Sequence, residues 1–235
     1  MSGGLLERLA PLPRYDLLEG DQIGRVENLD AVVCRADGRE IAELAPGVLA
    51  GDRYPDGSPV DASDYLRIRS RKSGPAKTYG LVVEQGAATF LVYWWWYAMN
   101  GFHWSTGGWH YGDWESVVIR VRGDQPDLAA YARHRTGEAR RWDRVRRESD
   151  RPLVFVALGS HAAHFDRGPL ATGRRAPDPP ELEQISPRSH PWLLWPGRWG
   201  QSRAGGRWAD SPRGPLFHRQ TRDPGGWIAG LLDAG

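Results

Sequence analysis

The feature that most constrains the fold is an aromatic run at residues 89–97, Thr-Phe-Leu-Val-Tyr-Trp-Trp-Trp-Tyr. Side chains of a β-strand alternate between its two faces, and in this run both faces are apolar. A strand of this kind lies inside a sheet that is covered on both sides. Residues 79–84 form a second apolar run, and residues 85–88, Gln-Gly-Ala-Ala, read as a turn between the two. The sequence therefore predicts a β-hairpin whose second strand is central and ends at Asn100-Gly101.

The composition favours an all-β fold. The chain has 235 residues, including 12 tryptophans, 29 glycines and 18 prolines. Gly and Pro interrupt helices, whereas Trp and Tyr suit pleated surfaces. We therefore expect an antiparallel β-sandwich with long Trp/Gly/Pro-rich loops and few short helices. The length fits one domain over residues 1–235, with N-terminal strands and loops over 1–75, a core sheet over 76–165, and an Arg/Trp/Pro/Gly-rich segment over 166–235 whose tryptophans pin it onto the sheet.

Two further strands are predicted after the hairpin, with an ambiguous segment between them. Residues 114–122 and 152–158 are apolar runs bounded by turn residues. Residues 128–134 fit a helix by the spacing of Leu128, Tyr131 and Ala132, but they also fit a strand, and periodicity alone leaves both open.

Charge and cysteine content exclude several classes of protein. The net charge of +2 gives no electrostatic case for nucleic acid as a partner. Eight arginines lie between Arg133 and Arg151 with four acids among them, which fits either a salt-bridged surface segment or a rim that faces an anion. Cys34 is the only cysteine, the N-terminus lacks the pattern of a signal peptide, and no apolar run is long enough to span a membrane. The expected location is the cytoplasm.

A cluster of polar residues stands at the start of the strand at 114–122. The segment 107–115 reads Gly-Gly-Trp-His-Tyr-Gly-Asp-Trp-Glu. Strand alternation places Asp113 and Glu115 on the same face as Val117 and Ile119, which we expect to be the apolar face. Ionised carboxylates at the end of a buried row need a partner, so they are protonated, paired with arginine or bound to a metal.

His110 lies three residues before Asp113, and an imidazole with two carboxylates is a suitable ligand set for a divalent ion. His161, in a turn after the strand at 152–158, and His134 can complete such a site. The structural alternative pairs the carboxylates with arginine and hydrogen-bonds His110 to the backbone. The sequence contains no G-x-S-x-G turn, no P-loop and no HExxH or paired CxxC signature, which argues against a serine hydrolase, a nucleotide-binding protein and a standard zinc site.

Several segments resemble the vacuolar-protein-sorting-associated family, which carries an HEGDWE motif. Residues 110–115, His-Tyr-Gly-Asp-Trp-Glu, resemble that motif, and the aromatic run with Asn100 resembles the strand that precedes it. Similar segments follow in the same order: residues 131–137, 156–162, 198–200 and 211–215. The resemblance covers roughly residues 76–224 and favours the strand at 130–134. Tyr111 replaces the usual Glu, and Arg133 and Arg135 replace Gln and Glu around His134, which points to an anionic ligand.

The necrosis- and ethylene-inducing proteins are similar over a shorter stretch. Their GHRHDWE motif has His, Asp and Glu at the spacing of His110, Asp113 and Glu115. This resemblance implies a β-sandwich, a divalent cation held by the motif, and a membrane sphingolipid headgroup as target. Those proteins are secreted and contain disulfides, and we expect neither feature in this chain.

Together these observations predict a divalent ion (Mg, Ca, Mn or Zn) held by His110, Asp113 and Glu115, with His161 as a fourth ligand. If the protein is an enzyme, the expected chemistry is metal-assisted hydrolysis of a small anionic or polar substrate. Its catalytic residues would be His134, Asp113 and Glu115, and its substrate-binding residues Arg133, Arg135, Tyr111, Trp109 and Asn100.

Two alternatives from other classes remain. The first is a non-catalytic, cytolysin-like module that binds a lipid headgroup or a glycan, with contact to a membrane surface. The second is a purely structural motif in which Asp113 and Glu115 cap loop amides without a metal.

Overall fold

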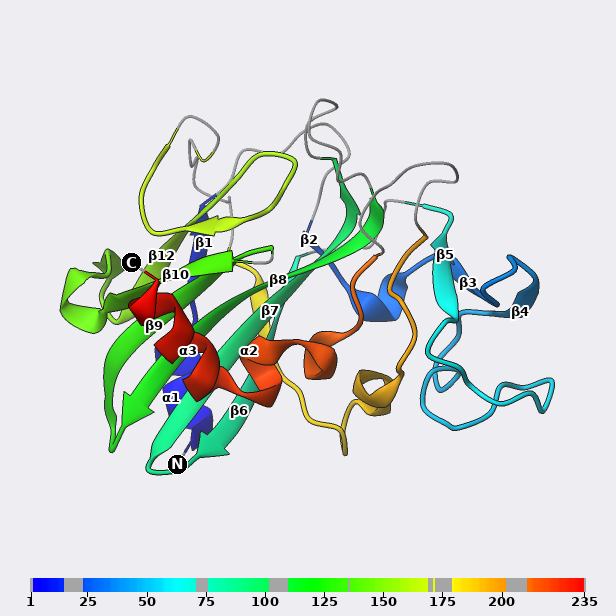
Figure 1. Ribbon diagram of the computed structural model, residues 1–235, viewed down its shortest axis with the longest axis horizontal. Coiled ribbons are helices and arrows are strands. Elements are labelled where there is room, and N and C mark those ends of the chain that lie inside the picture. The colour runs from blue at the N-terminus through cyan, green and yellow to red at the C-terminus, as the bar shows by residue number, and fades with distance from the viewer. Residues whose placement is uncertain are drawn as a thin grey trace.

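A seven-stranded sheet forms the centre of the molecule, with the order β10-β9-β8-β7-β6-β14 and β2 paired to β7 (Figure 1). The computed structural model describes residues 2–14, 23–70, 76–101, 110–134, 136–168, 171, 179–201 and 211–234. The strands of the central sheet are β2 (Ile23–Gly24), β6 (Lys77–Gln85), β7 (Ala88–Asn100), β8 (His110–Arg122), β9 (Gln125–Arg133), β10 (Thr136–Arg141) and β14 (Glu181–Gln184).

Two smaller sheets accompany the central one. A four-stranded sheet contains β1 (Leu12–Arg14), β11 (Arg147–Glu148), β12 (Arg151–Val156) and β13 (Ala163–His164), and a three-stranded sheet contains β3 (Ala31–Cys34), β4 (Glu40–Glu43) and β5 (Tyr65–Ile68). The helices are short: α1 (Ser2–Arg8), α2 (Arg219–Arg222), α3 (Pro224–Asp233) and the 3-10 turns η1 (Val26–Asn28), η2 (Trp142–Arg144), η3 (Pro191–Leu194) and η4 (Pro215–Phe217). The predicted β-sandwich class is confirmed. The strands are mainly antiparallel, but β1 with β12 and β14 with β6 are parallel pairs.

The predicted hairpin is β6 and β7, and β7 is central as expected. Leu91, Tyr93, Trp95 and Tyr97 pack on one face of the sheet with side chains from α1, β12 and β13. The alternate residues of β7, among them Trp94 and Trp96, pack on the other face. Because both faces are covered, the aromatic run is buried from Phe90 to Tyr97.

The second face of the central sheet is covered by the three-stranded sheet, the tryptophan-containing segment before residue 201, and the C-terminal helices. Trp195 and Trp199 are fully buried there, beside Trp227 of α3. Figure 1 shows α3 and α1 on opposite sides of the central strands. Trp195, Trp199 and Trp227 thus belong to the core on this face, whereas Trp208 lies outside the described part of the chain.

The structure corrects the description of β8 in one respect. Asp113, Glu115, Val117 and Ile119 do share a face, but the opposite face is equally buried, since Trp114, Ser116 and Val118 are all inaccessible to solvent. The reason is that the tryptophan-containing segment covers the face that we expected to be less apolar. The Asp113 and Glu115 carboxylates therefore lie in a strand that is interior on both sides.

The remaining expectations on strands are settled as follows. Residues 125–133 form β9, which decides between the strand and the helix for residues 128–134. The run at 152–158 forms β12, which ends at Val156 and leaves His161 in the following turn.

The arginine-rich segment is salt-bridged: Arg133 and Arg140 both pair with Glu138, and Arg140 also pairs with Asp166.

None of the described helices combines the length and the hydropathy that crossing a membrane requires.

Candidate functional site

The candidate site lies where β7 ends and β8 begins. In the register of these two strands Asn100 is opposite His110, and Tyr97 is opposite Asp113. The turn after β9 brings His134 to the same place, and the turn after β12 brings His161. We call Asn100, Asp113, Glu115, His134 and His161 the acid–histidine cluster.

Asp113 and His161 form the buried half of the cluster. The Nδ1 atom of His161 lies 3.1 Å from Oδ2 of Asp113, and the Asn100 amide donates to the same oxygen at 3.3 Å. The His161 ring stacks on the Tyr97 ring with the centroids 3.8 Å apart and the planes 5° from parallel. Asp113 is only 4% exposed, so its contacts with His161 and Asn100 supply the partners that a buried carboxylate requires.

Glu115 and His134 form the accessible half. The Nδ1 atom of His134 lies 3.2 Å from Oε1 of Glu115. The Glu115 side chain is 3% exposed, whereas the His134 side chain is 41% exposed. His134 therefore links a buried carboxylate to solvent, and an external ligand can reach the cluster through its ring.

Both histidines have an unusual backbone conformation. His134 has φ 55° and His161 has φ 58°, in the left-handed region, and among the described non-glycine residues only Ser149 shares a positive φ. Such a conformation costs of the order of 1 kcal/mol for a residue with a side chain. Two of these three residues meet in one cluster, which is the distribution expected for a functional site.

The electrostatics of the two carboxyl groups differ. Burial opposes ionisation of Asp113, but the hydrogen bond from His161 and the charges of the nearby histidines outweigh it and hold the pKa of Asp113 below its ordinary value. Burial raises the pKa of Glu115 to about 7, with the hydrogen bond to His134 acting against it and the charge of Asp113 adding to it. The hydrogen bond to Glu115 raises the pKa of His134. Asp113 is therefore the ionised member of the cluster, whereas Glu115 titrates near neutral pH.

A pH dependence of stability follows from the Glu115–His134 pair. In the folded protein Glu115 keeps a proton up to about pH 7, whereas in the unfolded chain it loses that proton near its ordinary pKa of 4.5. The free energy of unfolding is therefore expected to fall by about 3 kcal/mol as pH rises from about 4.5 to about 7. The raised pKa of His134 acts in the same direction, because its stabilisation is lost as pH rises through its folded pKa. In Glu115→Gln this decline of the unfolding free energy should disappear when urea unfolding is measured at a series of pH values. An unchanged decline would contradict the assignment of the pH dependence to the Glu115–His134 pair.

Asp113 produces the opposite dependence at lower pH. Because its folded pKa lies below the unfolded value, its stabilisation is present above the unfolded pKa and is lost as pH falls through the folded one.

His110 is buried beside the cluster and has a defined tautomer. Its Nδ1 atom lies 2.8 Å from the carbonyl oxygen of Gly112. A carbonyl can only accept, so Nδ1 carries the hydrogen and Nε2 of the neutral ring keeps its lone pair. This is the form in which a histidine binds a metal: Nε2 is the ligand atom, and the hydrogen bond from Nδ1–H to a backbone carbonyl holds the ring in its orientation.

The donors present suit a divalent ion in kind but are not assembled into a complete site. Carboxylate oxygens and a neutral imidazole are appropriate ligands. However, within the described ranges no three His, Cys, Asp or Glu side chains are arranged so that they could hold one ion. Asp113 and Glu115 are instead engaged in two separate acid–histidine pairs.

The other predicted site residues have different environments. The Arg133 guanidinium pairs with Glu138, and its Nε donates to the Ala163 carbonyl at 3.3 Å. The Tyr111 side chain packs against the tryptophan-lined core, while its backbone carbonyl accepts from the Ser211 hydroxyl at 2.7 Å. Trp109 and Arg135 lie outside the described residues.

Sequence reasoning missed the contact that fixes the start of β8. A Cβ atom on Gly112 would lie 1.6 Å from the Trp199 carbonyl oxygen, and a Cβ atom on Gly200 would lie 1.7 Å from the Tyr111 carbonyl oxygen. The backbones of residues 111–112 and 199–200 therefore cross without room for a side chain on either glycine. The Tyr111 N–H also donates to the Gln201 carbonyl at 3.1 Å. The two segments, Gly-Asp-Trp-Glu and Arg-Trp-Gly, are both part of the family resemblance, but nothing in either one specifies that they meet.

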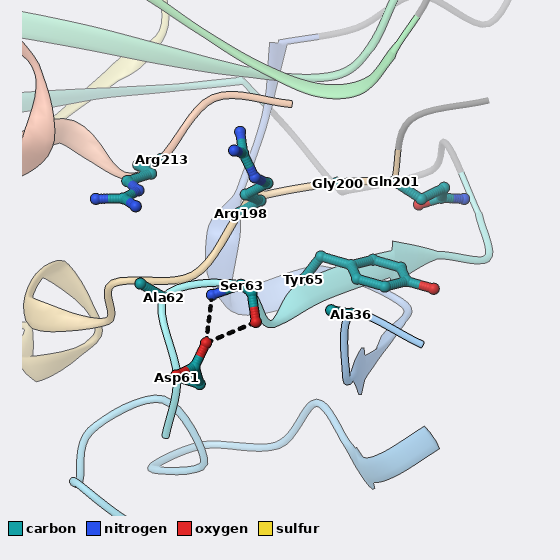
Figure 2. Close-up of a pocket in the computed structure, with 9 residues that line it drawn as sticks. All are labelled: Ala36, Asp61, Ala62, Ser63, Tyr65, Arg198, Gly200, Gln201 and Arg213. Carbon is teal, nitrogen blue, oxygen red and sulfur yellow. Dashed lines mark hydrogen bonds between the residues drawn. The ribbon is translucent and has the colours of Figure 1, made fainter. Parts of the chain in front are cut away.

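A cavity of about 630 Å³ is lined in part by Gly200, one of the two glycines of this crossing. Figure 2 shows its lining: the 61–65 segment, with the Asp61–Ser63 turn and Tyr65, faces the segment of Arg198, Gly200 and Gln201, and Arg213 lies beside Arg198. Both amide atoms of Gln201 are hydrogen-bonded to the backbone of Ile68, so this residue ties β5 to the crossing segment. Gly200 thus belongs both to the lining of this cavity and to the crossing at the start of β8.

Comparisons with known proteins give structural neighbours only. No protein-family model and no curated protein sequence matches the chain, so the resemblance to the vacuolar-protein-sorting-associated family rests on the motifs alone. Among solved structures the chain is similar to necrosis and ethylene inducing protein 2 from the causal agent of cocoa's witches' broom disease, with 18% identity, 77% of this chain and 72% of that chain covered, and a TM-score of 0.45. It is also similar to NLPPya in complex with glucosamine (15% identity, 91% and 85% covered, TM-score 0.46) and to the non-toxic HaNLP3 protein (13% identity, 94% and 90% covered, TM-score 0.45).

Proposed function

We propose that this protein is a non-catalytic binding module that holds a sugar or lipid headgroup at the acid–histidine cluster. The observation that carries the proposal is the pairing of two buried carboxylates with two histidines whose backbones are both in the left-handed region. Buried acids and strained histidines cost stability, and proteins keep such features where they serve a ligand.

The chemistry of the cluster suits a ligand rich in hydroxyl and amino groups. An ionised carboxylate accepts from up to four donors, and the amide of Asn100 and the histidine rings offer both donors and acceptors. His134 is half-exposed and forms the accessible contact, while Tyr97 and His161 provide a rigid stacked base below it. A hydroxylated headgroup would replace the water that otherwise solvates His134.

A second candidate function is acid–base catalysis by Glu115 and His134. A histidine whose Nδ1 is held by a carboxylate is the usual arrangement of a general base, and burial raises the pKa of that carboxylate, Glu115, to about 7. The two functions differ in whether the bound ligand is chemically converted. Mass spectrometry of the ligand after long incubation with the protein should return it intact if the protein only binds it.

A divalent ion at the cluster is a separate proposal. His110, Asp113, Glu115 and His161 would hold it, and the two acid–histidine pairs would have to open for these ligands to converge. A bound ion would add a positive centre that attracts hydroxyl or phosphate oxygens. Calorimetric titration with Mg²⁺, Ca²⁺, Mn²⁺ and Zn²⁺ in turn should give one stoichiometric site that is lost in Asp113→Ala. Failure of all four ions to bind would rule out the ion site, and headgroup binding would then be tested by itself.

The binding proposal is tested with free sugars and with vesicles. Glucosamine and mannosamine, the ligands of two of the similar structures, serve as probes in calorimetric titration, with glucose as the analogue that lacks the amino group. We expect amino-sugar binding that weakens at least tenfold in His134→Gln. His190→Gln is the matched control, because His190 also pairs with a carboxylate, its Nε2 lying 2.9 Å from Oε1 of Glu183.

Vesicles of phosphatidylcholine with and without a glycosylated sphingolipid form the second arm of the test. Sedimentation of the protein only with the glycosylated vesicles would support a lipid headgroup as the ligand. If neither sugars nor vesicles bind the protein, or if His134→Gln and His190→Gln have the same effect, the proposal is wrong.

A further inference from the structure

A second cavity lies away from the acid–histidine cluster, between η1, the turn at residues 44–50 and η3. Its volume is about 320 Å³. Engineered apolar cavities of about half this size bind benzene, so the space is sufficient for a one-ring or two-ring compound. None of its lining residues belongs to the acid–histidine cluster or to the crossing at Gly112 and Gly200.

The wall of this cavity is mainly apolar. The larger apolar lining residues are Val26, Leu29, Leu44, Leu49 and Trp192, with two prolines and two alanines, one of which is Ala45, between them. The Trp192 ring is held in place by other rings: it stacks on Trp114, with centroids 6.1 Å apart, and meets the edges of Tyr79 and Trp199. The wall is therefore rigid, which lowers the entropic cost of binding a ligand there.

One end of the cavity is acidic. Glu27 and Glu183 line it, and the single lysine at this end, Lys77, pairs with Glu183 and lies 3.8 Å from Glu27. His190 also contacts Glu183, and the Tyr79 hydroxyl donates to Glu27 at 3.1 Å. Two carboxylates with one lysine carry a net charge of −1 when His190 is neutral. Each carboxylate has about four acceptor positions, so both retain capacity for a further donor.

An apolar wall with an aromatic ring and an acidic end suits one class of ligand. An ammonium group gains from the carboxylates and from the face of a nearby tryptophan, whereas an organic anion would be repelled. We infer that this cavity binds a small amphipathic amine, with an aromatic or alkyl body against Trp192 and Leu49 and its ammonium group at Glu27 and Glu183. The site is independent of the proposed headgroup site.

Three compounds of the same shape test the charge preference. Phenethylamine, phenethyl alcohol and phenylacetate are titrated separately while tryptophan fluorescence and heat are recorded. We expect phenethylamine to bind at least tenfold more tightly than phenylacetate, with phenethyl alcohol between them. Equal affinities for the three compounds, or no binding of phenethylamine at millimolar concentration, would overturn the inference.

Two variants locate the binding. Glu27→Gln, at an exposed rim position, should weaken the affinity for phenethylamine about threefold to tenfold and leave the affinity for phenethyl alcohol unchanged. A general loss of folded protein would lower both signals together and would leave the ratio of the two affinities unaltered. Ala45→Phe places a ring at the mouth of the cavity and should abolish binding of both. Ala62→Phe, at another exposed position, on the 630 Å³ cavity, is the matched control. If Ala45→Phe binds phenethylamine as the wild type does, the amine is held elsewhere and the inference is wrong.

Discussion

Gly112→Ala is expected to prevent the chain from folding stably. Gly112 has φ 66°, a backbone conformation that costs alanine about 1–2 kcal/mol. In addition, the new Cβ atom would lie 1.6 Å from the Trp199 carbonyl oxygen and 2.6 Å from its carbon, and a backbone atom cannot move aside as a flexible side chain can. The crossing would have to separate, together with the burial of Trp199. We expect a loss of more than about 4 kcal/mol, a large part of the 5–15 kcal/mol that stabilises a typical domain.

Gly86→Ala is the control for this prediction. Gly86 also has a positive φ, 61°, but a Cβ atom there would meet nothing within 4 Å. Its replacement should therefore cost only the backbone term of about 1–2 kcal/mol. Gly200→Ala should behave like Gly112→Ala, since its Cβ atom would lie 1.7 Å from the Tyr111 carbonyl oxygen. The measurement is urea unfolding followed by tryptophan fluorescence, and equal stability of Gly112→Ala and Gly86→Ala would show that the crossing is not a close contact.

Asp113→Ala is expected to have the second largest effect. Removal of this carboxylate leaves the buried Nδ1–H of His161 and an N–H of Asn100 without the acceptor that both use. Removing one partner of a buried, hydrogen-bonded pair costs about 3–5 kcal/mol. The same change should abolish binding at the acid–histidine cluster, because His161 loses the group that orients it. Urea unfolding and sugar titration of the same sample measure the two effects.

Asp113→Asn separates the loss of charge from the loss of the hydrogen-bond acceptor. The amide oxygen can still accept from His161, so this variant should retain more stability than Asp113→Ala, with a gap of at least about 1 kcal/mol. The free energy of unfolding of Asp113→Asn should also lack the decline at low pH that protonation of Asp113 causes in the wild type. If Asp113→Ala is as stable as the wild type, Asp113 and His161 do not form the buried pair described above.

The parts of this structure that could be predicted from the sequence are those decided by local pattern. The aromatic run at 89–97 has two apolar faces, and that property alone requires a central strand. Strand alternation placed Asp113 and Glu115 on one face, and the turn residues after β12 placed His161 at a strand end. These inferences need only the period of a strand and the residues of a turn.

The parts that could not be predicted depend on contacts between distant segments. The stacking of His161 on Tyr97 and the crossing of Gly112 with Gly200 bring together residues from separate regions of the chain, and no local pattern specifies such a pairing. The covered second face of β8 has the same origin, because the rings that pack on Trp114, those of Trp192 and Trp199, come from a segment after residue 190.

Helix α3 has a local signal in the sequence at its first residues. Asp223 precedes Pro224 at the start of α3, and its Oδ1 atom accepts from the Gly226 N–H at 3.0 Å. An Asp cap followed by proline at the first helical position is a standard start of a helix. The helix was predictable, whereas its packing of Trp227 and Ile228 into the core was not.

The central claim is that the acid–histidine cluster is the ligand site, and NMR with labelled histidine and tryptophan tests it most directly. During titration with glucosamine, the ring signals of His134 and His161 should shift progressively and saturate, while those of His190 and Trp192 at the second cavity should stay in place. Saturable shifts confined to His190 and Trp192, or no shift of His134 and His161 at millimolar glucosamine, would contradict the account.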